Sequence, residues 1–300
     1  MFFLNILILL AAILVAAGFY LAALAVYPKV IPYLETCRRE VEAGKINLAE
    51  FDAWPKEEFW IQSPFGYPLH AMYFPLDGAQ KTVVIVHGIT WSLYGSVKYM
   101  PIFRKRGFNM LVYDHRKHGL SGGKNCTFGY FEKYDLKRVV DWAFSRLDPG
   151  GKVGTHGESL GGATVLQHAA LDTRLSFVIA DCPFSDLETL LAYRLKVEYH
   201  LPAFPLLKFA SLASYLLTGM RFSNVSPIRA VRAVTTPVLF CHGAQDGYIP
   251  PQMSVDLQRA KRLGISRLYL APNAHHAEAF WNNQEEYDRI TGEFLAESGL

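Results

Sequence analysis

A serine enclosed by two glycines is the first candidate for chemistry in this chain. Residues 157–161 read Gly-Glu-Ser-Leu-Gly, a G-x-S-x-G motif between a short apolar run and a helix-like stretch. At a sharp strand-to-helix turn, this motif lifts the serine hydroxyl above the sheet at the positive end of a helix. Ser159 is therefore predicted to be a nucleophile. The alternative is an ordinary glycine-rich turn in which the hydroxyl has no chemical role.

A base and an acid must accompany such a serine, because its hydroxyl attacks well only when a base removes the proton. The expected order along the chain is serine, acid, histidine. Asp246 follows one apolar run, and His275 and His276 follow the last one. His276 is preferred as the base because it precedes the next helix more closely, and His275 stays as the alternative. Asp181 is a competing acid, but Asp246 is better placed to reach the histidine loop from a neighbouring strand.

Two backbone amides are expected to stabilise the oxyanion that forms when the serine attacks a carbonyl group. Leu160 directly follows the nucleophile, and Ile89 lies in the loop after the first buried run. His87 in that loop is predicted to brace the loop rather than to catalyse. No metal and no cofactor are expected, because the remaining histidines lie on separate loops without a paired i, i+4 arrangement; these are His115, His118, His156 and His242.

The elements that position these residues follow from alternating apolar and amphipathic stretches. This pattern predicts an α/β protein with a mostly parallel sheet covered by helices on both faces. Strands are expected at 82–86, 108–113, 152–156, 177–180, 237–241 and 267–270, and helices at 96–106, 131–146, 160–171, 253–263 and 279–295. Residues 185–232 show no strand pattern and are predicted to form a helical cap. The alternative is two ordinary crossover helices.

The N-terminal segment has a different character, with no charged residue from Phe2 to Pro28. Residues 2–27 are long enough to cross the hydrocarbon core of a bilayer, so a transmembrane helix is predicted. A cleaved signal peptide is the alternative, because 23–25 read Ala-Leu-Ala. No basic region precedes the apolar run, which argues against that alternative. A buried core helix is disfavoured because the segment is not amphipathic.

The flanking charges predict the orientation of a single-pass protein in the cell membrane. Lys29, Arg38, Arg39 and Lys45 follow the span and no basic residue precedes it, so the catalytic domain is expected in the cytoplasm. Digestion of that domain by protease added outside spheroplasts would contradict this orientation.

Composition narrows the function classes further. The net charge is only +3 and no long basic run occurs, which argues against nucleic acid as a partner. The four cysteines are far apart and match no metal spacing, so they are read as reduced structural thiols.

Together the motifs resemble the α/β-hydrolase superfamily, and most closely its serine-aminopeptidase-like and monoacylglycerol-lipase-like branch, which includes membrane-anchored bacterial members. The resemblance covers about residues 58–298. It implies a triad of Ser159, Asp246 and His276 with Ile89 and Leu160 as oxyanion donors. The pieces that carry it are H-G at 87–88, Y-D-H-R-K-H-G-L-S-G-G at 113–123, G-E-S-L-G-G at 157–162, G-A-Q-D at 243–246 and H-A at 276–277.

The sequence departs from the family pattern at one position, and its nucleophile argues against two related classes of enzyme. Lys117 stands where the family's D-x-R-G-x-G-x-S loop usually has glycine. That loop is structural in the family, so the change does not touch the triad. A serine nucleophile also argues against haloalkane dehalogenases and epoxide hydrolases, which have aspartate at that position.

The predicted organisation is a transmembrane helix (2–27), a connector (28–57) and an α/β-hydrolase domain (58–300) that contains the cap. Because the cap is rich in Leu, Phe, Tyr and Ala, the expected substrate is a small-molecule or lipid-like carboxylic ester with an apolar acyl group. One alternative is an aminopeptidase-type enzyme, in which Glu188 or Glu198 would bind the substrate amine. Another is a membrane-anchored scaffold without catalytic activity.

Overall fold

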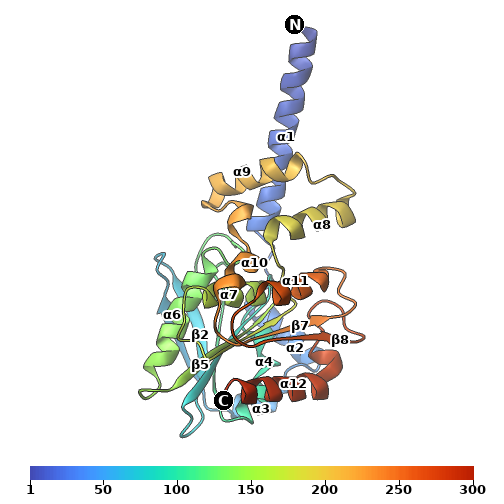
Figure 1. Cartoon of the computed structure of the whole chain (residues 1–300). Helices are drawn as coiled ribbons and strands as arrows, with labels where there is room; N and C mark the ends of the chain where they lie inside the picture. The colour runs from blue at the N-terminus through green and yellow to red at the C-terminus, as the bar shows by residue number, and fades with distance from the viewer.

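An eight-stranded sheet forms the centre of the computed structural model, which describes residues 1–300 (Figure 1). Its spatial order is β1-β2-β4-β3-β5-β6-β7-β8. The pairs β1–β2 and β2–β4 are antiparallel, and all other neighbours are parallel. The strands are β1 (Glu57–Gln62), β2 (Pro68–Phe74), β3 (Lys81–Val86), β4 (Asn109–Tyr113), β5 (Lys152–Glu158), β6 (Phe177–Asp181), β7 (Val238–Gly243) and β8 (Ser266–Ala271).

Helices cover both faces of this sheet, as its continuously apolar strands require. One face packs against α6 (Glu132–Ser145), α7 (Leu160–Ala169) and α11 (Gln252–Ala260). The other face packs against α3 (Leu48–Ala53), α5 (Met100–Arg104) and α12 (Gln284–Glu297), with α4 (Tyr94–Val97) beside them. The side chains of 83–86 in β3 are completely buried between these layers. The predicted α/β class with a mostly parallel sheet is confirmed.

Two local expectations differ from the structure. The hairpin β1–β2 was not expected, because Pro64, Gly66 and Pro68 interrupt its sequence pattern and β1 is a largely exposed edge strand. The helix expected at 96–106 is instead divided into α4 and α5. Pro101 at the start of α5 has no N–H to continue the preceding turn, so the chain begins a new helix there.

No strand occurs within the predicted cap, residues 185–232, which we call the cap segment. It contains α8 (Leu187–Tyr199), α9 (Leu206–Thr218), α10 (Pro227–Ala230) and two short 3-10 helices, η1 (Phe222–Asn224) and η2 (Val231–Ala233); a third, η3 (Trp281–Asn283), precedes α12. Asp186 caps α8 by accepting hydrogen bonds from two amides of its first turn. Gly219 ends α9 in the left-handed conformation that glycine adopts without strain.

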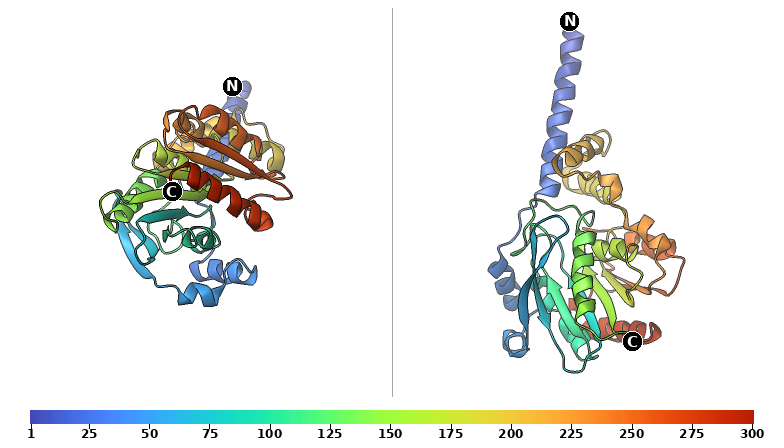
Figure 2. Two further views of the ribbon diagram at one scale, coloured as in Figure 1. Left: turned by 60° about the horizontal axis from the view of Figure 1, so that its bottom comes forward. Right: turned by 90° about the vertical axis from the view of Figure 1, so that its left-hand side faces the viewer.

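The N-terminal helix α1 (Phe2–Val26) extends well beyond the sheet and its helices (Figure 1). It is long and apolar enough to cross a membrane. Its C-terminal part lies beside α8 and α9 of the cap segment, as Figure 1 and the right panel of Figure 2 show. After α1, the helix α2 (Tyr33–Glu42) and α3 lead into β1.

Candidate active site

The turn from β5 to α7 holds Ser159 in a backbone conformation that side-chain-bearing residues rarely adopt. Its φ is 56° and its ψ is −113°. A Cβ on Gly157 would lie 2.3 Å from the carbonyl oxygen of Gly161, and a Cβ on Gly161 would lie 2.1 Å from that of Val86. Both glycines of the motif are therefore required by close backbone contacts. The strained turn leaves the serine hydroxyl free of any local hydrogen bond at the start of α7.

Three side chains predicted from the sequence meet at the carboxyl edge of the sheet. The Oγ atom of Ser159 lies 3.0 Å from Nε2 of His276. The Nδ1 atom of the same ring lies 2.7 Å from Oδ2 of Asp246. The three residues come from the ends of β5, β7 and β8, which are far apart in sequence but share one edge of the sheet. A proton can thus pass from the serine to an imidazole that the carboxylate orients.

The carboxylate of Asp246 is fully enclosed by hydrogen-bond donors. Its Oδ1 accepts from the amides of Tyr248 and Ile249, and its Oδ2 also lies 3.1 Å from Nε2 of His242. Burial by itself raises the pKa of Asp246. The hydrogen bonds from His242 and His276 outweigh burial and hold the pKa well below its usual range. Asp246 is therefore ionised at neutral pH, as an orienting acid must be.

The two alternatives that the sequence left open lie elsewhere. His275 is exposed, and its Nδ1 lies 3.0 Å from the carbonyl oxygen of Gln245 rather than from the serine. Asp181 is completely buried beneath the turn, where Tyr99 OH lies 3.1 Å from its Oδ2. Burial and the charge of Glu158 raise the pKa of Asp181 to about 6. The structure thus brings His276 and Asp246, not these two residues, to Ser159.

Both expected oxyanion donors lie beside the nucleophile. Leu160 is the first residue of α7, directly after Ser159. The loop after β3 passes close by, because a Cβ on Gly88 would lie 3.5 Å from the Cβ of Ser159. No loop or turn hydrogen bond uses the amide of Ile89 or that of Leu160. Two backbone donors near the serine are therefore available to a substrate oxygen.

His87 braces the loop that carries Ile89. Its Nδ1 lies 2.7 Å from the carbonyl oxygen of Gly88, and its Nε2 accepts the amide hydrogen of His115. Burial lowers the pKa of His87 to about 4, so the ring is neutral and both nitrogens are used by backbone. The second loop brace is the carboxylate of Asp114, which accepts from the amides of Leu93 and Leu120.

The family departure at Lys117 has a visible structural consequence. Its φ is 69°, which is the left-handed conformation that makes glycine usual there. The chain keeps this conformation despite the lysine side chain, because the Lys117 amide donates to the carbonyl of Gly122.

A buried ion pair under the nucleophile was not anticipated from the sequence. Glu158, the second residue of the motif, is 6% exposed and lies 2.5 Å from Nζ of Lys98. The hydroxyl of Tyr99 lies 2.6 Å from the same carboxylate oxygen. Burial raises the pKa of Glu158, but the Lys98 charge outweighs it and lowers the pKa overall. The only sequence signal was a charged residue within an otherwise small and apolar motif.

Glu40 of α2 also reaches the site from the connector. One of its carboxylate oxygens accepts from Nε1 of Trp91 at 2.6 Å, and the other has no hydrogen-bond partner. The side chain is 2% exposed, and burial raises its pKa. Nothing in the sequence pattern linked this residue to the motif, since 119 positions separate it from Ser159.

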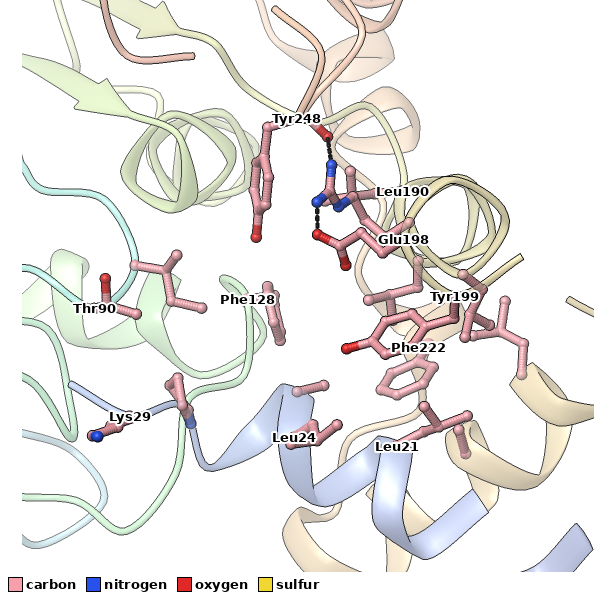
Figure 3. A pocket seen from close by; sticks show the side chains of 18 residues that line it. Leu21, Leu24, Lys29, Thr90, Phe128, Leu190, Glu198, Tyr199, Phe222 and Tyr248 are labelled. Atoms are coloured by element: carbon pink, nitrogen blue, oxygen red, sulfur yellow. Dashed lines mark hydrogen bonds and ion pairs between the residues drawn. The ribbon is translucent and has the colours of Figure 1, made fainter. Parts of the chain in front are cut away.

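Two adjoining cavities lie at or beside the nucleophile. The first, of about 420 Å³, contains Ser159 and His276, and four of its lining residues are charged, namely Glu40, Lys45, Lys98 and Glu158. The second, of about 410 Å³, is mainly apolar and lies between α1, the cap segment and the loops above the sheet (Figure 3). The two cavities share Ile89, Thr90 and Tyr248 as lining residues. The second cavity is therefore adjacent to the one that holds Ser159.

The cap segment is tied to the loop that holds the acid. The guanidinium of Arg194 in α8 lies 4.1 Å from the ring centroid of Tyr248, and it donates to the carbonyls of Gly247 and Tyr248. Arg194 also forms an ion pair with Glu198 one turn later, at the edge of the apolar cavity (Figure 3). The Tyr248 ring in turn lies 4.9 Å from the ring of His276.

Comparison with known proteins identifies the family of this chain. The family model described as serine aminopeptidase, S33, matches residues 77–225. The uncharacterized protein YqkD of Bacillus subtilis is 36% identical over 288 residues, which are 95% of this chain and 94% of YqkD.

Solved structures show the same fold. An esterase of Pyrococcus furiosus aligns with a TM-score of 0.67 at 24% identity, over 83% of this chain and 93% of its own. Est1E of Butyrivibrio proteoclasticus, solved with bound ferulic acid, aligns with a TM-score of 0.61 at 21% identity, over 80% of this chain and 98% of its own. The chain belongs to the serine aminopeptidase-like (S33) family of the α/β-hydrolase superfamily.

Proposed function

We propose that this protein is a serine hydrolase that cleaves a carboxylic ester with an apolar acyl group through an acyl-enzyme on Ser159. The observation that carries the proposal is the 3.0 Å contact between Ser159 Oγ and His276 Nε2, in a ring that Asp246 orients. This arrangement removes the serine proton at the moment of attack. The structural neighbour from Pyrococcus furiosus is an esterase, which supports the same reaction class.

The reaction proceeds in two steps, acylation and then deacylation of Ser159. Ser159 Oγ attacks the ester carbonyl carbon while His276 Nε2 takes its proton, and the amides of Ile89 and Leu160 donate to the oxyanion. The carbonyl–alkoxy bond then breaks, and His276 returns the proton to the departing alcohol. A water molecule then loses a proton to His276 Nε2 and attacks the acyl carbon. The bond between that carbon and Ser159 Oγ breaks, His276 returns the proton to Oγ, and the carboxylic acid leaves.

The lining of the two cavities supports an amphiphilic ester as the substrate. Of the 18 residues around the apolar cavity, 13 are hydrophobic, whereas only 4 of the 12 around the cavity that holds Ser159 are, and four of those 12 are charged. An apolar acyl chain gains free energy by leaving water for the first cavity. A polar alcohol group finds hydrogen-bond partners in the second. We therefore assign the acyl chain to the apolar cavity and the leaving alcohol to the cavity that holds Ser159.

The second candidate function is an aminopeptidase-type reaction, and one observation favours it. Glu40 lines the cavity that holds Ser159, and one oxygen of its buried carboxylate has no hydrogen-bond partner, so the residue is a candidate to pair with a substrate ammonium group. Lys45 and Lys98 line the same cavity and repel such a cation, so we prefer the ester. Glu188 and Glu198, the residues expected for this role, are paired instead, with Lys208 at 3.7 Å and with Arg194.

We further propose that α1 anchors the protein in a membrane. Large apolar side chains of its N-terminal part are exposed; Leu7, for example, is 62% exposed, and Leu9 is 60%. Water is an unfavourable solvent for such a surface, and the hydrocarbon core of a bilayer is a favourable one.

A fluorophosphonate probe tests the hydrolase proposal, because such probes phosphonylate activated serines. The detergent-solubilised wild type is expected to be labelled and to hydrolyse p-nitrophenyl esters. Ser159→Ala is expected to lose labelling and at least 10³-fold in kcat/KM, since the nucleophile is gone. Ser145→Ala, which changes an exposed serine of α6, is the matched control and should behave as wild type.

The outcomes separate the candidate functions. An unlabelled wild type, or equal labelling of Ser159→Ala, would reject the hydrolase and favour a scaffold. Activity confined to aminoacyl-p-nitroanilides would replace the ester proposal with the aminopeptidase one.

A further inference from the structure

The apolar cavity beside the nucleophile is built partly by the N-terminal helix. Leu21, Leu24 and Ala25 of α1 line it, opposite residues of α8 and α9 (Figure 3). Without α1, one side of this cavity would be open to solvent. The segment that the sequence marks as a membrane span is therefore also part of the wall of a cavity next to Ser159.

The contact between α1 and the cap segment is close and specific. A Cβ on Gly18 would lie 2.6 Å from the Cβ of Phe209, so only glycine permits this approach of α1 to α9. Ala22 and Val26 are completely buried. The carbonyl of Val26 accepts a hydrogen bond from the amide of Cys126 at 2.8 Å. The C-terminal part of α1 is thus packed as a structural element of the domain, whereas its N-terminal part is exposed.

The cavity is open to the outside beside the C-terminal part of α1. Leu24 and Tyr199 both line it, yet they are 47% and 50% exposed. From here α1 extends away from the domain toward the N-terminus (Figure 2), and its large apolar side chains there are exposed. If that surface lies in hydrocarbon, the opening faces the bilayer. At its inner end the cavity shares Ile89 and Tyr248 with the cavity that contains Ser159.

We propose that the C-terminal part of α1 is a wall of the acyl-binding site, so that one helix both anchors the enzyme and selects its acyl chain. The substrate class is a lipid ester resident in the bilayer, whose acyl chain enters between α1 and the end of α8. This inference rests on the proposed ester hydrolysis. It also requires that α1 be retained, because cleavage after Ala25 would remove all three lining residues of the helix.

Substitution of Leu24 tests this wall directly. Leu24→Trp adds volume at the lining position, and Leu9→Trp makes the same change on the exposed part of the same helix. Initial rates are measured for the full chain in detergent with p-nitrophenyl acetate, butyrate, octanoate and dodecanoate. Leu24→Trp is expected to lower kcat/KM at least 10-fold for dodecanoate and less than 3-fold for acetate. Leu9→Trp should keep the wild-type profile.

A smaller side chain gives the opposite prediction and covers the case in which Leu24→Trp does not fold. Leu24→Ala is expected to raise the dodecanoate-to-butyrate ratio of kcat/KM at least 3-fold. Acyl-length profiles equal to wild type in both Leu24 variants would overturn the inference while leaving the hydrolase proposal intact. If the wild type hydrolyses none of the esters and takes no fluorophosphonate, the proposed function itself fails.

Reconstitution tests the route of entry. Wild-type protein in phosphatidylcholine vesicles is given p-nitrophenyl hexadecanoate either in the same bilayer or in separate, protein-free vesicles. Hydrolysis is expected to be at least 10-fold faster when the ester shares the bilayer. Equal initial rates in the two arrangements would reject entry from the bilayer.

Discussion

Ser159 is positioned almost entirely by backbone. Its φ of 56° is imposed by a turn whose two glycines touch carbonyl groups of neighbouring chain segments. The amide of Ser159 donates to the carbonyl of Asp181 at 2.8 Å, which fixes the turn to β6. A side chain held in this way has no competing local hydrogen bond, so its hydroxyl is available to His276.

Asp246 acts on Ser159 through His276. Replacing Asp246 with asparagine tests that role. In Asp246→Asn an N–H group can face Nδ1 of His276, which then becomes an acceptor and leaves the proton on Nε2. The ring in that tautomer cannot take the proton of Ser159. We expect kcat on p-nitrophenyl butyrate to fall by about 10³- to 10⁴-fold, as in other triads.

The exposed Asp77→Asn provides the control for this measurement, because the same chemical change occurs far from the site. A kcat of Asp246→Asn within 3-fold of wild type would show that the carboxylate does not orient the base.

At the scale of elements, the site depends on how closely β3 and α7 approach each other. This approach brings the loop after β3, with Ile89, to the start of α7, with Leu160. The contact is possible because Gly161 has no side chain where α7 passes the carbonyl of Val86. The oxyanion donors are therefore a product of helix-to-strand packing rather than of the loop sequences themselves.

The substitution Gly161→Ala should push α7 away from the end of β3. The added Cβ would lie 2.1 Å from the carbonyl oxygen of Val86, and backbone cannot move aside as a flexible side chain can. Overpacking of this kind costs about 1–3 kcal/mol or more, so we expect a lower midpoint of thermal unfolding and at least a 100-fold loss of kcat/KM. Tryptophan fluorescence on heating and the ester assay measure the two effects.

Gly247→Ala is the matched control, because no atom lies within 4 Å of the position of its Cβ. It should unfold at the wild-type temperature. A Gly161→Ala variant with wild-type stability and activity would contradict the close approach.

For the whole molecule, a notable feature is the number of buried neutral histidines. Burial lowers the pKa of His87 to about 4, of His156 to about 3 and of His168 to about 4. In the unfolded chain these rings titrate near 6.5. As the pH falls below that value, the unfolded state binds protons that the folded state does not, so stability is lost between about pH 6.5 and pH 4.

Buried acids with a raised pKa act in the opposite direction, and Asp135 is an example. Burial raises the pKa of Asp135 to about 7, although Ser63 and Tyr67 donate hydrogen bonds to it. The folded state therefore binds this proton more readily, and the stability that Asp135 contributes decreases as the pH rises from about 4 to about 7. The total pH dependence is the sum of both effects, so single histidines must be tested by substitution.

His168→Leu isolates one histidine. Both ring nitrogens of His168 lack a hydrogen-bond partner, so leucine leaves no polar group unpaired. Relative to wild type, the free energy of unfolding of the variant should be greater at pH 5 than at pH 7.5 by about 2 kcal/mol, from a pKa of about 4 against 6.5.

Urea unfolding in detergent at the two pH values measures this difference. Between pH 7.5 and pH 9 the ring is neutral in both states, so the difference between variant and wild type should stay constant there. If the free energies of unfolding of variant and wild type differ by the same amount at pH 5 and pH 7.5, His168 does not contribute to the loss of stability in acid.

Much of the fold follows from local sequence patterns, for a simple reason. The parallel strands are buried on both faces, so each appears as an unbroken apolar run such as 82–86. The hairpin of β1 and β2 lacked that signal, because β1 lies at an edge and prolines interrupt the pattern. The side of the membrane and the catalytic roles of the site residues stay predictions.

The sequence by itself determined the nucleophile motif, the order of serine, acid and histidine, and the long apolar helix, since each depends on residues close together in the chain. Only the tertiary structure decided that His276 rather than His275 faces Ser159, because ring orientation depends on contacts with distant strands. It also placed Glu40, Lys98 and the end of α1 at the site. These contacts join residues that are 60 or more positions apart, and no local pattern encodes them.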